Sequence, residues 1–296
     1  MKYEMGVRGL YTYLREYRHD IYVTTLPAQK LRIGFDAMSM LYKYKSSYED
    51  IYPILKILKD AGHVLFFVLD GKAPVEKEAE VKERRDVREG ATNQAAVIKG
   101  QLETANLSAK EREILEYSVA RLEFQGWRMT REIRQAFQAG LTKMEIPYFK
   151  ATYEADDVLV DLWAAGKLDV VVSTDMDFLL SGVPRLWIPS RNGFEEIILS
   201  EVLEGEGMDQ EAFLDAGILC GVEPLRGKVS VNSSTAFSWM RYYKRIEVLL
   251  NSTVRDSRLD GLDDVQSVRA HFGAHPWSER IRPDHLEICK SFLETL

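Results

Sequence analysis

The sequence predicts an α/β fold in which helices flank a mostly parallel sheet, and three apolar runs are the basis of this prediction. LRIGF, VLFFVL and LDVVVST are short, continuous and rich in branched and aromatic residues, which is typical of buried strands. Helical patterns separate these runs along the chain, as crossover helices separate parallel strands. In such a sheet, ligands bind at the edge where the strands have their carboxyl ends.

An aspartate follows each of the three apolar runs. Asp36 ends the first run, Asp70 the second and Asp175 the third, with Asp177 two residues later. Because the carboxyl ends of parallel strands meet at one edge of a sheet, we expect these four carboxylates to converge there.

A fourth strand is predicted over residues 146–150, and a helix that begins near Glu154, capped by Thr152, is predicted after it. Glu154, Asp156 and Asp157 then lie in the first turn, where the helix dipole favours an anion by a few tenths to about 1 kcal/mol. Two carboxylates about 4 Å apart repel each other by roughly 4 kcal/mol at an effective dielectric near 20. The dipole therefore does not offset the repulsion, and we expect cations or protons to do so.

The combined set of acids predicts a divalent-metal site. These residues supply only hard oxygen ligands, with no His or Cys nearby, and this chemistry suits Mg²⁺ or Mn²⁺. Two such ions, about 4 Å apart, are the usual apparatus for phosphodiester hydrolysis. Asp161 and Asp169, in the same stretch, are interpreted instead as surface carboxylates or helix caps.

Composition indicates a globular protein that is neither secreted nor inserted in a membrane. The chain has 296 residues, of which 46% are hydrophobic and 29% charged, and its two cysteines, Cys220 and Cys289, predict neither a disulfide nor a zinc site. It has no apolar h-region and no uncharged apolar run of about 18 residues. We expect an intracellular location, with nucleus, cytoplasm and viral factory left open. The net charge of −7 argues weakly against nucleic acid as a partner, although a local basic patch can override it.

Five motifs occur in a fixed order along the chain. They are MGVRGL (5–10), FDAMSMLY (35–42), VLDGKAP (68–74), MEIPYFKATYEADD (144–157) and STDMDFLLSG (173–182), and FLDAGILCGVE (213–223) follows more loosely. In order and spacing this set resembles the flap endonuclease and XPG superfamily of structure-specific nucleases. YEADD is also similar to the 5′ nuclease domain of bacterial DNA polymerase I, whereas MGVRGL resembles eukaryotic or viral members.

The resemblance implies a PIN-like α/β domain with a helical arch insertion and a helical C-terminal region. The nuclease core is expected over residues 5–200 with the arch at about 76–140, and a divergent helix-hairpin-helix-like DNA-binding element is expected within 201–296. The resemblance implies two Mg²⁺ ions, which Mn²⁺ can replace. The implied metal-site carboxylates are Asp36, Asp70, Glu154, Asp156, Asp175 and Asp177, with Asp157 and Glu223 added because relatives have an acid at those positions.

Basic residues in the predicted arch are assigned roles through the same resemblance. Lys77 and Arg84 have the spacing from Asp70 at which the family places two cations that neutralise charge on the scissile phosphate. Arg88 extends their helical stripe towards nucleic acid, although most charges there are interpreted as solvated. Tyr42 matches an aromatic residue on which a base stacks, with a place in the core as the open alternative. SAKE, at residues 108–111, predicts a helix start by a capping box, followed by a long helix or a pair of helices as far as residue 140.

The sequence departs from the family after residue 220. PLRGKVSVNSSTAF replaces a glycine-rich hairpin that binds potassium and duplex DNA, so that hairpin is predicted to be altered or missing. Arg226 and Lys228 are expected to contact phosphate directly instead. The last residues, LEICKSFLETL, do not resemble a sliding-clamp peptide.

These observations predict a metal-dependent nuclease that acts in DNA replication, repair or recombination. The expected reaction is two-metal hydrolysis of DNA phosphodiesters at 5′ flaps, nicks, gaps or ends, on branched, nicked or single-stranded DNA, by a monomer. RNA as substrate, and exonuclease versus endonuclease polarity, stay open. The alternative is a catalytically silent relative that binds nucleic acid or protein as a scaffold. Because a scaffold has no reason to keep mutually repelling carboxylates and both cations, the enzyme is favoured.

Overall fold

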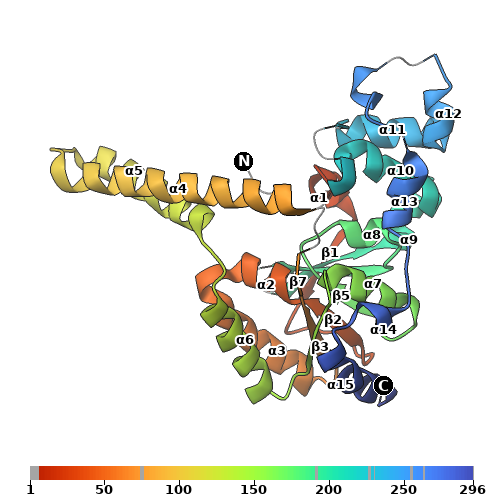
Figure 1. Ribbon diagram of the computed structural model, residues 1–296, viewed down its shortest axis with the longest axis horizontal. Coiled ribbons are helices and arrows are strands. Elements are labelled where there is room, and N and C mark those ends of the chain that lie inside the picture. The colour runs from red at the N-terminus through yellow and green to blue at the C-terminus, as the bar shows by residue number, and fades with distance from the viewer. Residues whose placement is uncertain are drawn as a thin grey trace. The chain divides into compact units, whose positions relative to one another are not determined.

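The computed structural model describes residues 7–73, 77–190, 193–225, 228–229, 231–253, 256–262 and 264–295. The chain forms two compact units (Figure 1). One comprises Met1–Gly71 and Leu141–Leu296, and the other comprises Lys72–Gly140.

A seven-stranded sheet forms the centre of the first unit, with the order β1-β7-β6-β5-β2-β3-β4. Its strands are β1 (Arg18–Tyr22), β2 (Arg32–Asp36), β3 (Val64–Leu69), β4 (Tyr148–Lys150), β5 (Val170–Val172), β6 (Arg185–Ser190) and β7 (Gly193–Ile198). Strands β6, β5, β2, β3 and β4 are parallel, and β7 and β1 are antiparallel additions at one edge. The predicted α/β class and the four predicted strands are confirmed.

Strands β1, β6 and β7 are not among the predicted strands, and β1 (RHDIY) and β7 (GFEEII) carry charges where a buried strand is usually apolar. In β7 the carboxylate of Glu196 is buried, and it accepts hydrogen bonds from the indole of Trp187 (2.9 Å) and from the guanidinium of Arg185 (2.7 Å). These two donors satisfy a charge that would otherwise be costly to bury. These partners on β6 allow the charged side chain of Glu196 to be buried in the sheet.

Short helices connect and cover these strands in the first unit. They are α1 (Leu10–Tyr13), η1 (Leu14–Tyr17), α2 (Ala37–Tyr44), η2 (Lys45–Asp50), α3 (Ile51–Asp60), α7 (Ala155–Ala164), α8 (Asp177–Leu180), α9 (Leu199–Glu206), α10 (Gln210–Gly221), η4 (Glu223–Leu225), α11 (Ser233–Tyr243), α12 (Ile246–Leu250), η5 (Ser257–Leu259), α13 (Val265–His271), α14 (Trp277–Arg280) and α15 (Pro283–Glu294). Successive residues of a strand face opposite sides of the sheet. Phe66 and Val68 pack in one cluster with Leu159 of α7, and the rings of Phe35 and Phe67 stack at 4.6 Å on the other face.

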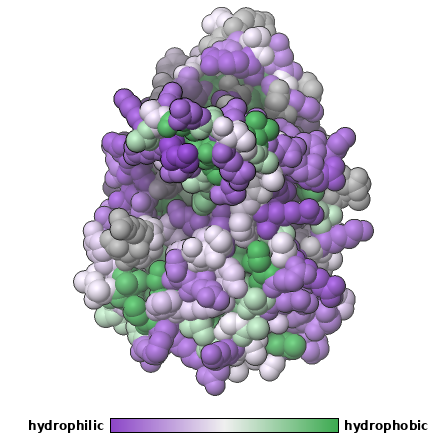
Figure 2. Space-filling model, turned by 90° about the vertical axis from the view of Figure 1, so that its left-hand side faces the viewer, coloured by the Kyte–Doolittle hydropathy of each residue, from purple (hydrophilic) through white to green (hydrophobic). Residues whose placement is uncertain are grey.

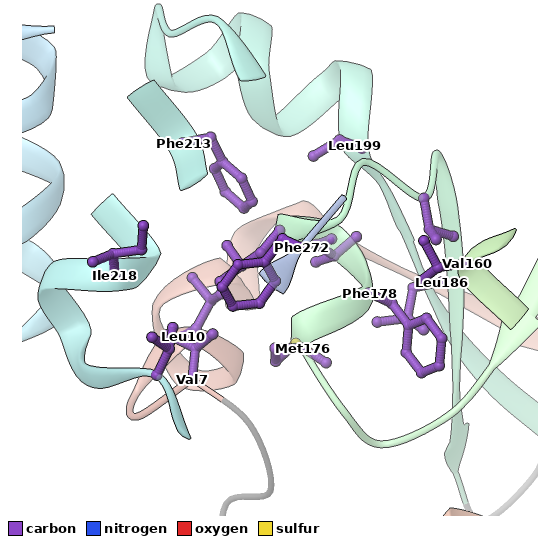
Figure 3. Close-up of a cluster of buried hydrophobic side chains, with 14 of the residues drawn as sticks. Val7, Leu10, Val160, Met176, Phe178, Leu186, Leu199, Phe213, Ile218 and Phe272 are labelled. Carbon is purple, nitrogen blue, oxygen red and sulfur yellow. The ribbon is translucent and has the colours of Figure 1, made fainter. Parts of the chain in front are cut away.

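The main hydrophobic cluster joins helices from both ends of the chain to one face of the sheet (Figure 3). Leu10 of α1, Phe178 of α8 and Phe213 of α10 are buried in it, together with Phe272 after α13. Each buried side chain of this size stabilises the fold by about 1.5–3 kcal/mol. Residues on both sides of position 200, where a domain boundary is predicted, contribute to this one cluster.

The second unit contains α4 (Glu78–Thr104), α5 (Ala109–Gly126) and the start of α6 (Arg131–Lys143). Helices α4 and α5 pack together through a small core of Ala91, Ala95 and Leu122. The hydroxyl of Ser108 accepts from the N–H of Glu111, whose carboxylate accepts from the N–H of Ser108, so the predicted capping box is confirmed. The prediction of an arch over the active site stays a prediction.

Hydrophobic residues are dispersed on the face that Figure 2 shows, where small green groups lie among hydrophilic purple residues. Within the part of the chain that the structure describes, no helix combines the length and apolar sequence needed to cross a lipid bilayer.

Gly71 permits a close backbone approach that joins the end of β3 to the segment before α7. Its N–H donates to the carbonyl of Tyr153 at 2.7 Å, and a Cβ atom at Gly71 would lie 2.2 Å from the carbonyl oxygen of Ala151. Any larger side chain therefore has to displace main-chain atoms rather than a flexible side chain.

We predict that Gly71→Ala lowers the free energy of unfolding by about 1–3 kcal/mol, because the new methyl group overpacks this junction. Gly90→Ala is the control, since no atom lies within 4 Å of a Cβ there and alanine is favourable inside a helix. Urea denaturation of both variants measures the difference. Equal stabilities would contradict the close approach at Gly71.

Candidate active site

Two aspartates stand at the carboxyl ends of adjacent parallel strands. Asp36 is the last residue of β2 and pairs in register with Val68 of β3, and Asp70 follows β3 directly. The Asp36 carboxylate also caps α2, because it accepts from the N–H of Ser39 at 3.0 Å. The predicted convergence of strand ends therefore holds for this pair.

Asp70 connects the strand ends to the acidic turn before α7. Its Oδ1 accepts from the N–H of Ala155, the first residue of α7, at 2.9 Å. Helix α7 begins after Glu154, which is its N-cap but forms no side-chain capping bond, so the prediction of Thr152 as the cap is wrong. The acceptor for the N-terminus of α7 is thus the side chain of Asp70, which is 85 residues away in the chain. The local sequence around Glu154 does not reveal such a distant partner.

Asp175 and Asp177 follow β5, which lies beside β2. The hydroxyl of Ser173 donates to Asp36 at 2.9 Å and accepts from the N–H of Asp175 at 3.1 Å. The N–H of Asp177 donates to Asp175 Oδ1 at 2.9 Å. The buried Ser173 thus links Asp36 of β2 to the segment after β5 that carries Asp175 and Asp177.

Sequence reasoning did not single out the hydroxyl residues of this site. Ser39 accepts from the N–H of Thr174 at 2.7 Å, and the two hydroxyl groups are 2.8 Å apart. With Ser173, they connect α2 to the segment after β5. Their position, one to three residues from the aspartates at the strand ends, is the signal that could have identified them.

The Asp36 carboxylate has a strongly perturbed pKa. Burial raises this pKa from 3.8 to about 8, the charge of Asp70 and then that of Asp156 add to the rise, and the bonds from Ser39 and Ser173 oppose it. Carboxylates from β2, β3 and α7 are therefore close enough to repel one another. A bound cation would relieve this repulsion.

The donor set fits a hard divalent cation, because all the acids at this edge offer carboxylate oxygens. Among the described residues, no three His, Cys, Asp or Glu side chains are already placed to hold one metal ion. Asp36 is buried, whereas Asp70, Glu154, Asp156, Asp175 and Asp177 are half-buried. The half-buried side chains lie where an ion from solvent can reach them.

Asp157, although next to Asp156, is engaged by a basic residue from the C-terminal region. Its Oδ1 lies 2.6 Å from the guanidinium of Arg280. Burial and then Asp156 raise the pKa of Asp157, and Arg280 lowers it. The role of Asp157 as a metal-site residue stays a prediction.

Asp161 was interpreted as a surface carboxylate or cap, and this interpretation is wrong. Its side chain is fully buried, accepts from the N–H of His275 at 2.6 Å and lies 3.4 Å from Nε of Arg280. Asp169 is partly exposed and forms an ion pair with Arg32 at 2.7 Å, at the beginning of β2. Distant partners thus decide the burial of both residues.

The predicted arch cations lie on α4, within the second unit. Lys77 is the N-cap of this continuous helix and is half-buried, and Arg84 is exposed. The Nε of Arg88 donates to the carbonyl of Arg84 at 3.0 Å. The predicted helical spacing is therefore present, while the roles of these residues stay predictions.

The remaining predicted residues are in the first unit. Tyr42 is half-buried on α2, Glu223 begins η4, and Lys228 is exposed. Arg226 lies outside the described residues, as do positions 227 and 230 of the predicted hairpin replacement. Helices α10 and α11, which flank this segment, pack together through Phe213 and Phe237, whose ring centroids are 5.7 Å apart.

Comparison with protein families identifies the segment that carries the acidic turn. The XPG I-region model matches residues 145–223. Flap endonuclease 1 of Haloquadratum walsbyi is 28% identical over 204 residues, which cover 68% of this chain and 58% of that protein. Flap endonuclease 1 of Fusarium vanettenii is 30% identical over 205 residues, which cover 67% of this chain and 49% of that protein. The chain thus spans about half to three fifths of the length of these relatives.

Solved structures share the fold over most of the chain. The catalytic core of Rad2 in complex with a DNA substrate matches with a TM-score of 0.63 and 16% identity, covering 90% of this chain and 85% of that one. Flap endonuclease 1 of Methanococcus jannaschii matches with a TM-score of 0.56 and 20% identity, covering 95% and 92%. Human GEN1 in complex with Holliday junction DNA matches with a TM-score of 0.58 and 16% identity, covering 90% and 66%. The predicted PIN-like α/β fold is confirmed.

We predict that Asp36 makes the metal-free protein less stable as pH rises. Because its folded-state pKa is about 8 against an ordinary 3.8, the folded state binds more protons than the unfolded state between these values. The free energy of unfolding should therefore fall by up to about 1.4 kcal/mol per pH unit over this range. Asp36→Asn should remove this component.

The measurement is urea denaturation of both proteins in EDTA at several pH values from 5 to 8. The difference between the two profiles isolates Asp36 from other acids. Parallel profiles would show that Asp36 does not titrate in this range.

Proposed function

We propose that the chain is a nuclease of the flap endonuclease and XPG superfamily, which hydrolyses DNA phosphodiesters with the help of divalent metal ions. The observation that carries this proposal is the repulsion of Asp36 by Asp70 and Asp156 at the carboxyl edge of the sheet. Carboxylates gathered in this way destabilise the fold unless a cation compensates for their charge. Divalent ions bound by these carboxylates would supply that compensation and the chemistry for phosphodiester hydrolysis.

Two Mg²⁺ ions are the proposed cofactors, and Mn²⁺ should replace them. The residues proposed to hold them are Asp36, Asp70, Glu154, Asp156, Asp175 and Asp177. When bound, the ions offset the charge of these carboxylates and of the phosphate that is cleaved. The hydrogen bonds of Ser173, Ser39 and the N-terminus of α7 orient the acids before any ion binds.

Basic and aromatic residues complete the proposed machinery. Lys77 and Arg84 stabilise charge that develops on the scissile phosphate, because a guanidinium or ammonium group acts most strongly where negative charge increases. Tyr42 stacks on a flanking base, and Arg88 and Lys228 contact phosphate groups. Arg226 is proposed to contact phosphate as Lys228 does, and Glu223 keeps the metal-site role that the family resemblance implies.

The proposed substrates are branched, nicked or single-stranded DNA, cleaved at 5′ flaps, nicks, gaps or ends. Solved relatives of the same fold were crystallised with a DNA substrate and with Holliday junction DNA, which supports DNA rather than RNA. A role in DNA replication, repair or recombination follows from this substrate class. We propose that the protein acts as a monomer inside the cell.

Cleavage of end-labelled DNA tests the proposed function. Flap, nicked, gapped and single-stranded substrates should be cut with Mg²⁺ and left intact in EDTA. Asp175→Asn should lower the rate at least about 100-fold, because charge stabilisation at a reacting centre is typically worth this much. Asp20→Asn, an exposed aspartate on β1, is the matched control and should retain full activity.

Two outcomes of this assay would contradict the proposal. Undiminished turnover in Asp175→Asn would remove this residue from the metal site. No cleavage of any substrate by the wild-type protein, despite DNA binding, would favour a scaffold.

The arch cations give a separate prediction. Arg84→Ala and Lys77→Ala should each lower the single-turnover rate at saturating enzyme by about 10²–10³-fold, more than they weaken DNA binding. Arg85→Ala is the control, because Arg85 is exposed on α4 and lies near Asp86 (3.7 Å) and Glu89 (3.9 Å). If Arg84→Ala weakens only binding, Arg84 positions phosphate and does not act on the transition state.

A further inference from the structure

Residues 280–282 are hydrogen-bonded to the end of β4 and to the turn that precedes α7. Two main-chain hydrogen bonds make this connection, from the Thr152 N–H to the Arg280 carbonyl (2.7 Å) and from the Arg282 N–H to the Lys150 carbonyl (2.9 Å). Together they form an antiparallel bridge between Ala151 and Ile281. Ile281 is buried at this junction. The segment lies beyond residue 223, where the match to the XPG I-region ends.

The side chain of Arg280 extends from this segment to one face of α7. Its guanidinium lies 2.6 Å from Asp157 and 3.4 Å from Asp161. Asp161 is fully buried, and the exposed fraction of the Arg280 side chain is 24%. Because an arginine stays charged at every physiological pH, it provides a permanent counter-charge for these two carboxylates.

Asp157 is also directly linked to the proposed metal site. Its N–H donates to Oδ1 of the neighbouring Asp156 at 2.9 Å, and Asp156 in turn repels Asp36. The two adjacent acids therefore have different surroundings. Asp156 is oriented by a main-chain donor and lies among carboxylates, whereas Asp157 has a close cationic partner.

We propose that Arg280 is a positioning residue, which holds Asp157 away from the metal ions and fixes the turn that carries Asp156. The inference rests on the proposed divalent-metal centre and adds to it a residue from outside the matched family segment. Asp157 cannot coordinate an ion directly without weakening a short ion pair beside a buried acid. Arg280 thus limits the number of carboxylates that can coordinate the ions.

The test is Mn²⁺ binding to the full-length protein without DNA, measured by isothermal titration calorimetry. Asp156→Asn should weaken binding at least about tenfold, because it removes a proposed ligand. Asp157→Asn should change the affinity by no more than about twofold, because Asp157 is committed to Arg280. Equal losses in the two variants would overturn the inference.

The Mn²⁺ affinity of Arg280 variants distinguishes a positioning role from a purely structural role. Arg280→Met should tighten Mn²⁺ binding by roughly three- to tenfold, because it leaves Asp157 uncompensated near the ions. Adding Asp157→Asn to Arg280→Met should restore the wild-type affinity. Arg280→Lys should also stay near the wild-type value, because it retains the charge. A tightening that persists in the double variant would contradict a role through Asp157.

The same titration separates this inference from the proposed function. If wild-type protein binds no Mn²⁺, the proposed metal centre fails and the inference fails with it. If the wild type binds Mn²⁺ and Asp157→Asn does not, only the inference fails. Thermal melting checks the fold, and if Arg280→Met does not fold because Asp161 has lost its partner, the Asp157→Asn and Arg280→Lys measurements still decide the question.

Discussion

The constraint on which this structure depends is the parallel pairing of β2 with β3 and with β5. Backbone hydrogen bonds fix the register of these strands, so Asp36 lies opposite Val68, two residues before Asp70, and the segment with Asp175 follows the neighbouring strand β5. The sheet cannot keep this register and also separate the carboxylates. Burial and, after it, the charge of Asp70 raise the pKa of Asp36. Hydrogen bonds from Ser39, Ser173 and Ala155 orient these acids.

Neutral donors supply the first part of that compensation. A backbone N–H of α2, the hydroxyl of Ser173 and the first N–H of α7 each bind one of the strand-end carboxylates. Such bonds favour the charged form of an acid and also hold its orientation. They do not remove net charge, and this leaves a site that attracts cations. The apolar packing beneath it, with α7 and α8 against the sheet, keeps the donors in place.

The C-terminal region contributes to the site through charge as well as packing. Main-chain hydrogen bonds attach residues 280–282 beside β4. Arg280 places a permanent positive charge next to Asp157 and Asp161 of α7. Because the first unit includes both ends of the chain, the core and the C-terminal helices share one hydrophobic cluster. This edge of the sheet is thus supported by residues far apart in sequence.

The sequence by itself determined the central strands and the acids at their ends. A buried parallel strand needs a continuous apolar run, and the residue at which that run stops marks the end of the strand. It also determined the capping box at Ser108, whose partners are three residues apart. Only the tertiary structure decided that Glu196 and Asp161 are buried, that Asp70 accepts from α7, and that Asp157 pairs with Arg280. The reason is physical: a polar group is buried when a distant partner satisfies it, and local periodicity carries no information about that partner.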